Sequence, residues 1–200
     1  MRKRYFKKNK FITGYTLIET MIALTVFLIV IVIGSSALVN VHIVNKKSQD
    51  TRSILDSLSF IMEDMSRNIR TGYDYRCIEV GQLLPTGPKS CTNGAGIFFE
   101  PSDGNPTNNN DNWDYIVFPD GKLYRSTNGS YVEAQMTQMT PDEVKINNTY
   151  SNFLILGAEP YPGDKQQPLV VIRLVGTITN KGVDIPFSLQ TAVSQRKNDR

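Results

Sequence analysis

Residues that carry common catalytic or metal chemistry are scarce in this sequence. It has one histidine, His42, and two cysteines, Cys77 and Cys91, among 200 residues. Because the single histidine follows a long apolar run, Ser/His/Asp and Cys/His catalytic arrangements are not expected. Two isolated thiols with no second CxxC also make a poor zinc site. The sequence therefore predicts a protein that is not an enzyme and has no cofactor.

Charge is absent from a long stretch near the N-terminus. Residues 20–45 contain no Asp, Glu, Lys or Arg, and this run exceeds the ~20 residues that a helix needs to cross the hydrocarbon core. Basic residues without any acid precede it, namely Arg2, Lys3, Arg4, Lys7, Lys8 and Lys10. The positive-inside bias then predicts a single membrane span with its N-terminus in the cytoplasm and its C-terminal part exported.

A short motif, Gly14-Tyr15-Thr16-Leu17-Ile18-Glu19, lies between the basic leader and the apolar run. A carboxylate near the start of a membrane helix is costly, so Glu19 is expected to have a partner. The leader, glycine, carboxylate and apolar run together resemble the class III signal of type IV pilins and type II secretion pseudopilins, with Tyr15 where the family usually has Phe. The alternative is an ordinary signal anchor.

The resemblance implies that a prepilin peptidase cuts after Gly14 and methylates the new N-terminus at Tyr15, while Glu19 supports assembly. It also implies other pilin or pseudopilin subunits, an inner-membrane assembly platform and the membrane as partners. Residues 58–70 and 187–196 resemble segments of the J-type minor pseudopilin and its pilus counterparts. The implied function is a structural subunit, a minor pilin or pseudopilin, within or at the tip of a type IV pilus or type II secretion pseudopilus.

An alternative function is a membrane-anchored extracytoplasmic binding module or surface enzyme that never enters a filament.

The charge of the chain gives no support to nucleic acid as a partner. The formal net charge is +3, from 22 Lys and Arg against 19 Asp and Glu. Without the leader, 16 basic residues face 19 acidic ones and the charge becomes −3. No direct nucleic-acid binding is therefore expected, because phosphate binding relies on clustered Lys and Arg.

Cys77 and Cys91 fall in the exported part of the chain, where disulfides form and persist. A bond between them would close a loop of about 15 residues and contribute about 3 kcal/mol in the chain-entropy model. A disulfide is favoured over two free cysteines.

The helix is predicted to continue beyond the membrane. Residues at helical spacing form one apolar stripe, namely Ile54, Leu55, Leu58, Ile61, Met62, Met65 and Ile69. Gly72 supplies a helix stop. Gly34-Ser35-Ser36 interrupts the apolar half, either as a place for bending or for close packing between helices. The predicted organisation is a leader at 1–14, a membrane and assembly half at 15–45, an amphipathic half at 46–71 and a β-rich extracytoplasmic head at 72–200.

Period-two alternation and turn residues dominate the head. Strands are predicted at residues 96–100, 114–118, 122–126, 131–135, 144–147 and 152–156. A final hairpin alternates on both sides of Asn180-Lys181-Gly182. The predicted fold class is α+β and pilin-like, with a long N-terminal α-helix packed on a C-terminal antiparallel β-sheet head.

One loop carries the spacing of an EF-hand calcium loop, through Asp103, Asn105, Thr107, Asn109, Asp111 and Asp114. Its central glycine position holds Asn108, and Asp114 replaces the usual bidentate Glu. A strand rather than a helix is expected to follow. Calcium is therefore the weaker alternative, and a solvated loop is favoured.

Overall fold

The computed structural model describes residues 14–79, 86–105, 107–130, 132–160, 162–163 and 165–196. The chain divides into two compact units, Met1–Lys47 and Ser48–Arg200, which we describe separately. Helix α1, Leu17–Thr71, contributes to both units. The leader preceding Gly14 lies outside the described residues.

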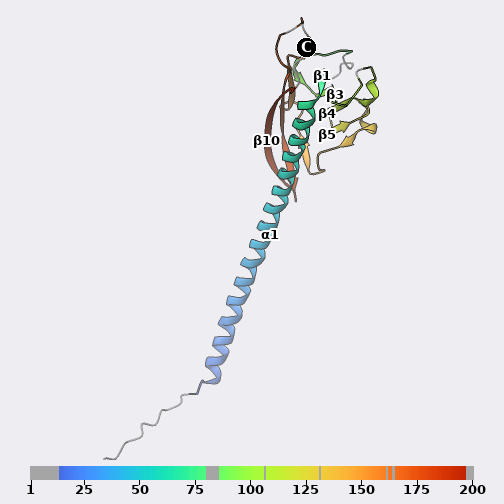
Figure 1. Cartoon of the computed structure of the whole chain (residues 1–200). Coiled ribbons are helices and arrows are strands. Elements are labelled where there is room, and N and C mark those ends of the chain that lie inside the picture. Colours follow the sequence, from blue (N-terminus) through green and yellow to red (C-terminus); the bar gives the residue numbers. More distant parts are fainter. Residues whose placement is uncertain are drawn as a thin grey trace, which may run out of the picture. The chain divides into compact units, whose positions relative to one another are not determined.

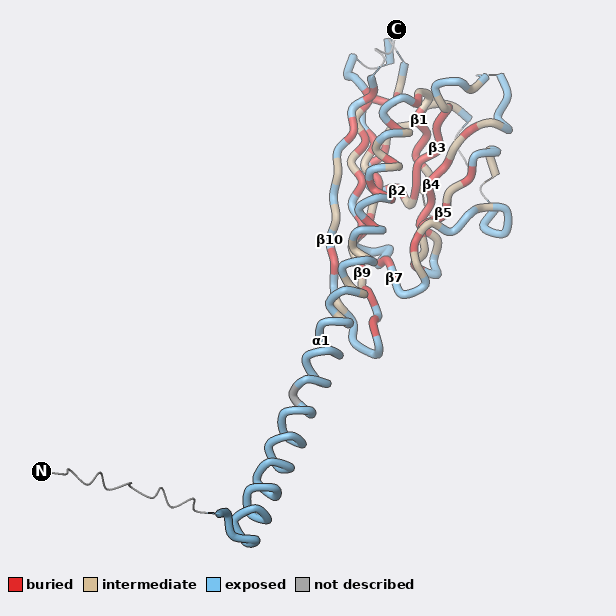
Figure 2. The backbone as a smooth tube through the Cα atoms, turned by 60° about the horizontal axis from the view of Figure 1, so that its bottom comes forward, coloured by how far each residue is buried: buried red, intermediate tan, exposed pale blue. Residues whose placement is uncertain are grey.

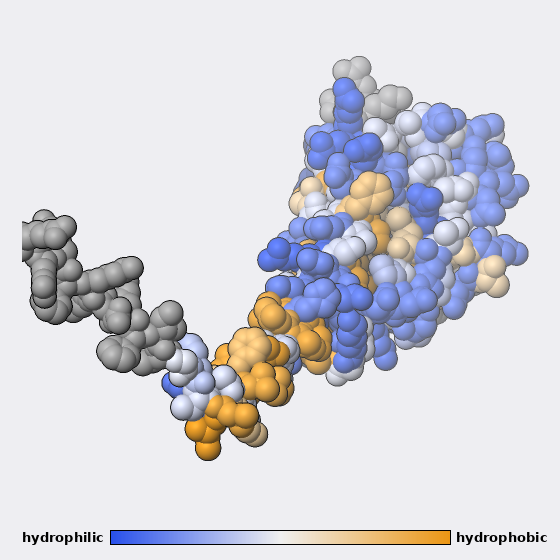
Figure 3. Space-filling view, turned by 90° about the horizontal axis from the view of Figure 1, so that it is seen from below, coloured by the Kyte–Doolittle hydropathy of each residue, from blue (hydrophilic) through white to orange (hydrophobic). Residues whose placement is uncertain are grey.

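In the first unit, α1 is apolar on every side and its large side chains are exposed. Figure 3 shows hydrophobic side chains covering this part of the helix on the face in view. The helix starts at Leu17, two residues later than predicted, and continues through Gly34, Ser35 and Ser36. The Ser36 hydroxyl donates to the Val32 carbonyl at 3.0 Å, a bond made inside the helix.

In the second unit, α1 buries one stripe of side chains. Leu58, Met65 and Ile69 are at most 1% exposed, whereas Phe60 on another face of the same helix is 72% exposed. The tube in Figure 2 shows strands β3, Gly96–Glu100, and β4, Trp113–Val117, as largely buried, whereas β10, Val183–Ser194, is mostly exposed. The amphipathic half predicted from the sequence therefore covers the head with its apolar stripe.

Three groups from outside α1 make four hydrogen bonds to carbonyls at its C-terminal end. The Tyr75 hydroxyl donates to the carbonyls of Ile69 and Gly72 at 2.6 and 2.8 Å. The Arg196 N–H donates to the Arg70 carbonyl at 2.9 Å, and the Gln195 amide donates to the Gly72 carbonyl at 3.3 Å. Since the last carbonyls of a helix have no partner within it, these bonds fix the helix end to both ends of the head's sequence.

The head contains two antiparallel sheets rather than the single sheet predicted. The first has the order β1-β3-β4-β5-β6. Its strands are β1 Tyr73–Ile78, β3 Gly96–Glu100, β4 Trp113–Val117, β5 Leu123–Ser126 and β6 Thr137–Gln138. Two short 3₁₀ helices, η1 Asn109–Asp111 and η2 Glu133–Gln135, lie between these strands in sequence. Figure 1 shows β1, β3, β4 and β5 side by side next to α1.

The second sheet has the order β10-β9-β8-β2, with β7 also paired to β9. Its strands are β2 Cys91–Gly94, β7 Val144–Ile146, β8 Asn152–Leu156, β9 Leu169–Asn180 and β10 Val183–Ser194. Lys181 and Gly182 have φ of 50° and 76°, as a tight hairpin turn between twisted strands requires.

Strand β10 forms one edge of this sheet and contains Pro186 opposite Thr177. The Gln195 N–H donates to the Pro168 carbonyl, which continues the register of the hairpin. Since hydrogen-bonded pairs alternate along an antiparallel ladder, Pro186 occupies a position whose N–H would point away from β9. A proline is tolerated there because it removes no ladder bond.

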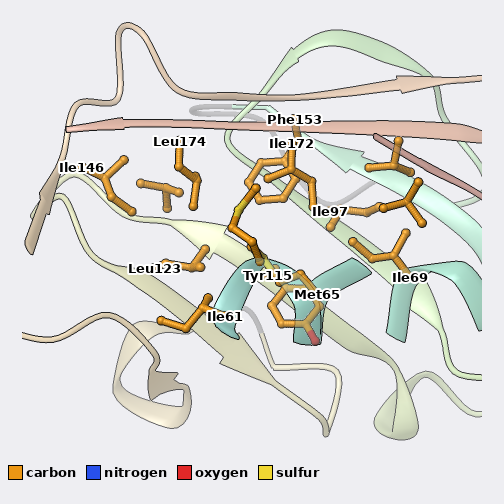
Figure 4. Close-up of a cluster of buried hydrophobic side chains, with 14 of the residues drawn as sticks. Ile61, Met65, Ile69, Ile97, Tyr115, Leu123, Ile146, Phe153, Ile172 and Leu174 are labelled. Atoms are coloured by element: carbon orange, nitrogen blue, oxygen red, sulfur yellow. The ribbon is translucent and has the colours of Figure 1, made fainter. Parts of the chain in front are cut away.

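The core combines α1 with both sheets. Figure 4 shows Ile61, Met65 and Ile69 of α1 next to Ile97, Tyr115 and Leu123 of the first sheet, with Phe153, Ile172 and Leu174 of the second sheet above them. All nine side chains belong to one buried hydrophobic cluster. The apolar stripe of the helix is thus buried against a β-rich layer, which is the α+β class expected from the sequence.

A polar contact also connects α1 to the first sheet. The Asn68 amide donates to the Tyr115 hydroxyl at 2.9 Å, and the Arg125 guanidinium lies 3.4 Å from Asp64 Oδ2. Burial raises the pKa of Tyr115 to about 12, with the Asn68 hydrogen bond opposing the shift. The phenol therefore stays protonated at physiological pH and can donate toward Asp64.

Most of the predicted strands are present, and their ends differ from the prediction by at most two residues. Residues 96–100, 152–156 and the final hairpin are strands as predicted. The prediction for residues 131–135 is wrong, since Glu133–Gln135 form η2, while Tyr131 lies outside the described residues. Strands β1, β2 and β6 were not predicted.

Replacing Met65 by Ala should destabilise the head, because Met65 is fully buried between α1 and the sheets. We expect a loss of about 2–5 kcal/mol in the free energy of unfolding. Phe60→Ala is the matched control on the exposed face and should change it by less than about 0.5 kcal/mol. Denaturant unfolding of the full chain in detergent measures both, and equal losses would contradict the packing described.

Candidate functional site

The predicted processing residues lie just ahead of α1. Gly14 and Tyr15 are both exposed, and Tyr15 is 83% exposed. A Cβ added at Gly14 would have no atom within 4 Å. The fold of the described residues therefore does not require glycine here, and any requirement must come from a partner.

Thr16 caps the first turn of α1, a role that the sequence analysis missed. The Glu19 N–H donates to Thr16 Oγ1 at 3.3 Å. A threonine followed three residues later by a glutamate is the spacing of a capping box, and this signal was available in the sequence. The cap fixes where the helix begins, two residues after Tyr15.

The Glu19 carboxylate lies in the first turn of α1 and is exposed. A negative charge at this end is favoured by the helix dipole. No described side chain forms an ion pair with it, so the partner expected for Glu19 is not supplied by residues 14–196 as far as the structure describes them. In a low-dielectric surrounding an unpaired carboxylate is costly.

Helix α1 is long and apolar enough to cross a membrane, and its most apolar window is 0% buried. Large side chains along this part, such as Phe27, Ile33 and Leu38, are more than half exposed. Burying each such side chain is worth about 1.5–3 kcal/mol. The segment therefore needs lipid or other apolar helices around it.

Cys77 and Cys91 form a disulfide, as the sequence analysis favoured, with their Cα atoms 6.0 Å apart. The bond joins β1, at one edge of the first sheet, to β2, at one edge of the second. The Cys77 N–H also donates to the Lys89 carbonyl at 3.1 Å. Both cysteines are buried. The disulfide is therefore a covalent connection between the two sheets inside the head.

The residues with EF-hand spacing do not assemble around one point. Asp114 lies on β4 and is fully buried, where its Oδ1 accepts a hydrogen bond from the Ser126 N–H at 2.9 Å. Asn105 instead accepts from the Thr107 hydroxyl at 2.9 Å, and Asp103 and Asn109 are exposed. Among the described residues, no three His, Cys, Asp or Glu side chains form a group that could hold a metal ion.

Asp114 is electrostatically unusual. Its Oδ2 is buried and has no hydrogen-bond partner within the described part of the chain. Burial raises the pKa of Asp114 from an ordinary 3.8 to about 7, with hydrogen bonds from Ser126 opposing the shift. The carboxyl is therefore largely protonated in mildly acidic solution.

A scan against protein-family models found no matching family, and searches of curated proteins and of solved structures found no significant match to this chain. The resemblance to pilins therefore rests on the N-terminal motif and on the arrangement of α1 and the head.

Removing the disulfide should weaken the head without abolishing its core. The double variant Cys77→Ala/Cys91→Ala should lose about 3 kcal/mol of unfolding free energy, because the unfolded chain regains the freedom of the closed loop. Urea unfolding of the full chain in detergent, compared with wild type with and without reductant, is the measurement. A variant as stable as the oxidised wild type would contradict this role.

Asp114 should make the head less stable as pH rises. Between about pH 4 and pH 7 the folded chain keeps a proton that the unfolded chain releases, so the unfolding free energy should fall by up to about 1.4 kcal/mol per pH unit and then level off. Asp114→Asn should remove this part of the slope, and the exposed control Asp103→Asn should not. Unfolding curves from pH 4 to 8 test it, and an unchanged slope in Asp114→Asn would refute the assignment.

Proposed function

We propose that this chain is a structural subunit, a minor pilin or pseudopilin, that is held in the inner membrane and then assembled into a type IV pilus or type II secretion pseudopilus, or placed at its tip. One observation carries the proposal. A single helix is apolar on all sides over its first half and covers a β-rich head with one stripe over its second half. A subunit that moves from the lipid bilayer into a bundle of apolar helices needs a first half that is apolar on every side and a second half that holds the head.

The N-terminal motif is the proposed site of cleavage. A prepilin peptidase cuts between Gly14 and Tyr15 and removes the basic leader. Both residues are exposed and precede the helix cap at Thr16. The scissile bond therefore lies in non-helical backbone, where a protease can reach it.

Glu19 supplies the register of assembly. Cleavage leaves a positively charged amine at Tyr15, and a neighbouring subunit's amine can pair with the Glu19 carboxylate. Opposite charges attract strongly in a low-dielectric bundle, whereas either one alone is costly. The absence of a described partner for Glu19 within the chain supports a partner from another subunit.

The proposed topology places the leader in the cytoplasm and the head outside it. Six basic residues lie before the span, against Lys46, Lys47 and Arg52 just after it. The disulfide between Cys77 and Cys91 supports an exported, oxidising surrounding for the head. The proposed partners are the peptidase, other pilin-like subunits and the membrane assembly platform, with no enzymatic role for the head.

Gly14→Val should leave the leader attached, because a side chain there blocks the approach of the peptidase to the backbone. Gly34→Val is the matched control, since a Cβ at Gly34 also meets no atom within 4 Å, and it should mature normally. Intact-mass measurement of each chain, produced together with a prepilin peptidase, gives the result. Normal maturation of Gly14→Val, or a wild-type chain that keeps its leader, would refute the proposal and favour a permanently anchored binding module.

A further inference from the structure

Strand β10 presents an unpaired backbone edge over residues 188–194. Its register with β9 is unbroken, and the N–H of Gln195 points toward β9. Because the direction of the N–H alternates along an antiparallel strand, every second N–H of β10 points away from β9. Within 188–194 these outward groups belong to Ser188, Gln190, Ala192 and Ser194. No acceptor among the described residues takes them up, and Figures 1 and 2 show β10 at the outer margin of the head.

The other strands at the sheet edges are short or irregular. Strands β6 and β7 have 2 and 3 residues, and the registers of β1 with β3 and of β2 with β8 are shifted. Native proteins disrupt their edges in these ways, or with charges and prolines, because a long regular edge pairs with other chains. Asp184 and Pro186 protect the hairpin end of β10 similarly, but residues 188–194 contain no charge, proline or glycine. Among the described strands, this segment is the long regular edge that is left open.

A groove lies between this segment and α1. It has a volume of about 400 Å³, and its lining includes Met62, Glu63, Ser66 and Arg70 of α1 with Leu189 and Thr191 of β10. Side chains directly opposite each other on paired strands share one face of the sheet. A strand added to β10 would therefore place alternate side chains beside Leu189 and Thr191, in the groove. The charges of Glu63 and Arg70 cancel, so the groove suits uncharged side chains.

The direction of β10 argues against a second copy of this chain as the added strand. The Asn180 amide at the hairpin turn donates to Thr51 Oγ1 at 3.3 Å, and the Arg196 N–H after β10 donates to the Arg70 carbonyl at 2.9 Å. Strand β10 and the second half of α1 therefore run in the same direction. Antiparallel pairing of two β10 strands would reverse the second α1, so that the Ser48 ends of the two helices would lie at opposite ends of the pair.

Two copies paired in this way could not both enter one membrane through the segments that precede Ser48. This step rests on the anchoring in the proposed function. A parallel pair of identical edges would need an offset of one residue, because both strands present the same alternate residues. Such a pair lacks the two-fold symmetry that is usual for two identical chains. The added strand is therefore expected from another protein.

We propose that residues 188–194 of β10, together with the groove beside α1, accept an extended segment of a different protein as an added antiparallel strand. Backbone hydrogen bonds to the outward groups of β10 supply affinity, and the groove supplies selectivity. The segment is uncharged, with apolar or β-branched residues at the alternate positions that face Met62 and Leu189. Its other side chains lie beside Gln190 and Ala192, which are exposed, and there small polar residues suffice.

A labelled peptide of alternating valine and threonine, with a lysine at each end for solubility, tests the proposal by fluorescence anisotropy with the full chain in detergent. We expect a dissociation constant below about 1 mM. Valines in the groove leave the threonine N–H groups facing β10. N-methylation of the threonines should therefore weaken binding by about tenfold or more, because several backbone hydrogen bonds are lost, whereas N-methylation of the valines should not. No binding up to about 1 mM, or equal losses with both methylated peptides, would overturn the proposal.

Variants of β10 locate the binding site. Gln190→Pro removes an outward N–H without removing a bond to β9, as Pro186 does, and should weaken binding of the peptide by about tenfold or more. Asp184→Pro is the matched control, because its N–H also points outward but lies beyond Pro186, and it should stay within about twofold of wild type. If Gln190→Pro does not fold, Thr191→Lys, which puts a charge into the groove, decides with the same expected loss. Binding that survives in Gln190→Pro or Thr191→Lys, or that Asp184→Pro removes equally, would overturn the assignment.

Oxidation of Gln190→Cys in lipid vesicles tests a second copy as the added strand. We expect no disulfide-linked dimer, and efficient formation of one would overturn the proposal. Failure of the proposed function is distinguishable. A chain that binds the peptide but keeps its leader in the presence of a prepilin peptidase would refute the proposed function and leave the added strand standing. A chain that matures normally without binding the peptide would do the reverse.

Discussion

The cost of exposing the first half of α1 to water is the constraint on which the rest of the molecule depends. Large apolar side chains project on every side of this segment, and each would cost about 1.5–3 kcal/mol in water. The segment can therefore exchange one apolar surrounding only for another. In the proposed function, the basic leader, the cap at Thr16 and the carboxylate of Glu19 act at the start of this apolar segment.

The second half of α1 differs from the first, because it has only one apolar stripe to bury. Met65 and Ile69 contact a layer built from two sheets, and the end of the helix is held by Tyr75 from the first sheet and Arg196 after the second. The disulfide joins the same two sheets close by. A force applied to this half of the helix would thus reach both sheets together.

Sequence reasoning succeeded where periodicity is strong and failed where contacts are non-local. The helix stripe and the β9–β10 hairpin have long repeating patterns, so both were predictable. Strand β1 contains Asp74, which has a φ of 55°, and β2 ends on Asn93-Gly94. Asp and Asn-Gly are typical of turns, so the sequence did not predict these two strands, which depend on pairing with neighbouring strands. The burial of the Glu100 carboxylate was likewise not predicted, because only the folded loop brings Gly104 against it.

Pro186 affects how the edge strand of the head can pair with strands of other molecules. Strand β10 is long and lies at the edge of its sheet, and such edges can recruit strands from other molecules into continuous cross-β aggregates. The proline leaves a gap in the row of outward donors close to the hairpin end of that edge, so a foreign strand could not pair with β10 along its full length. Where copies of the head come together, pairing between their sheets along β10 would be interrupted at Pro186.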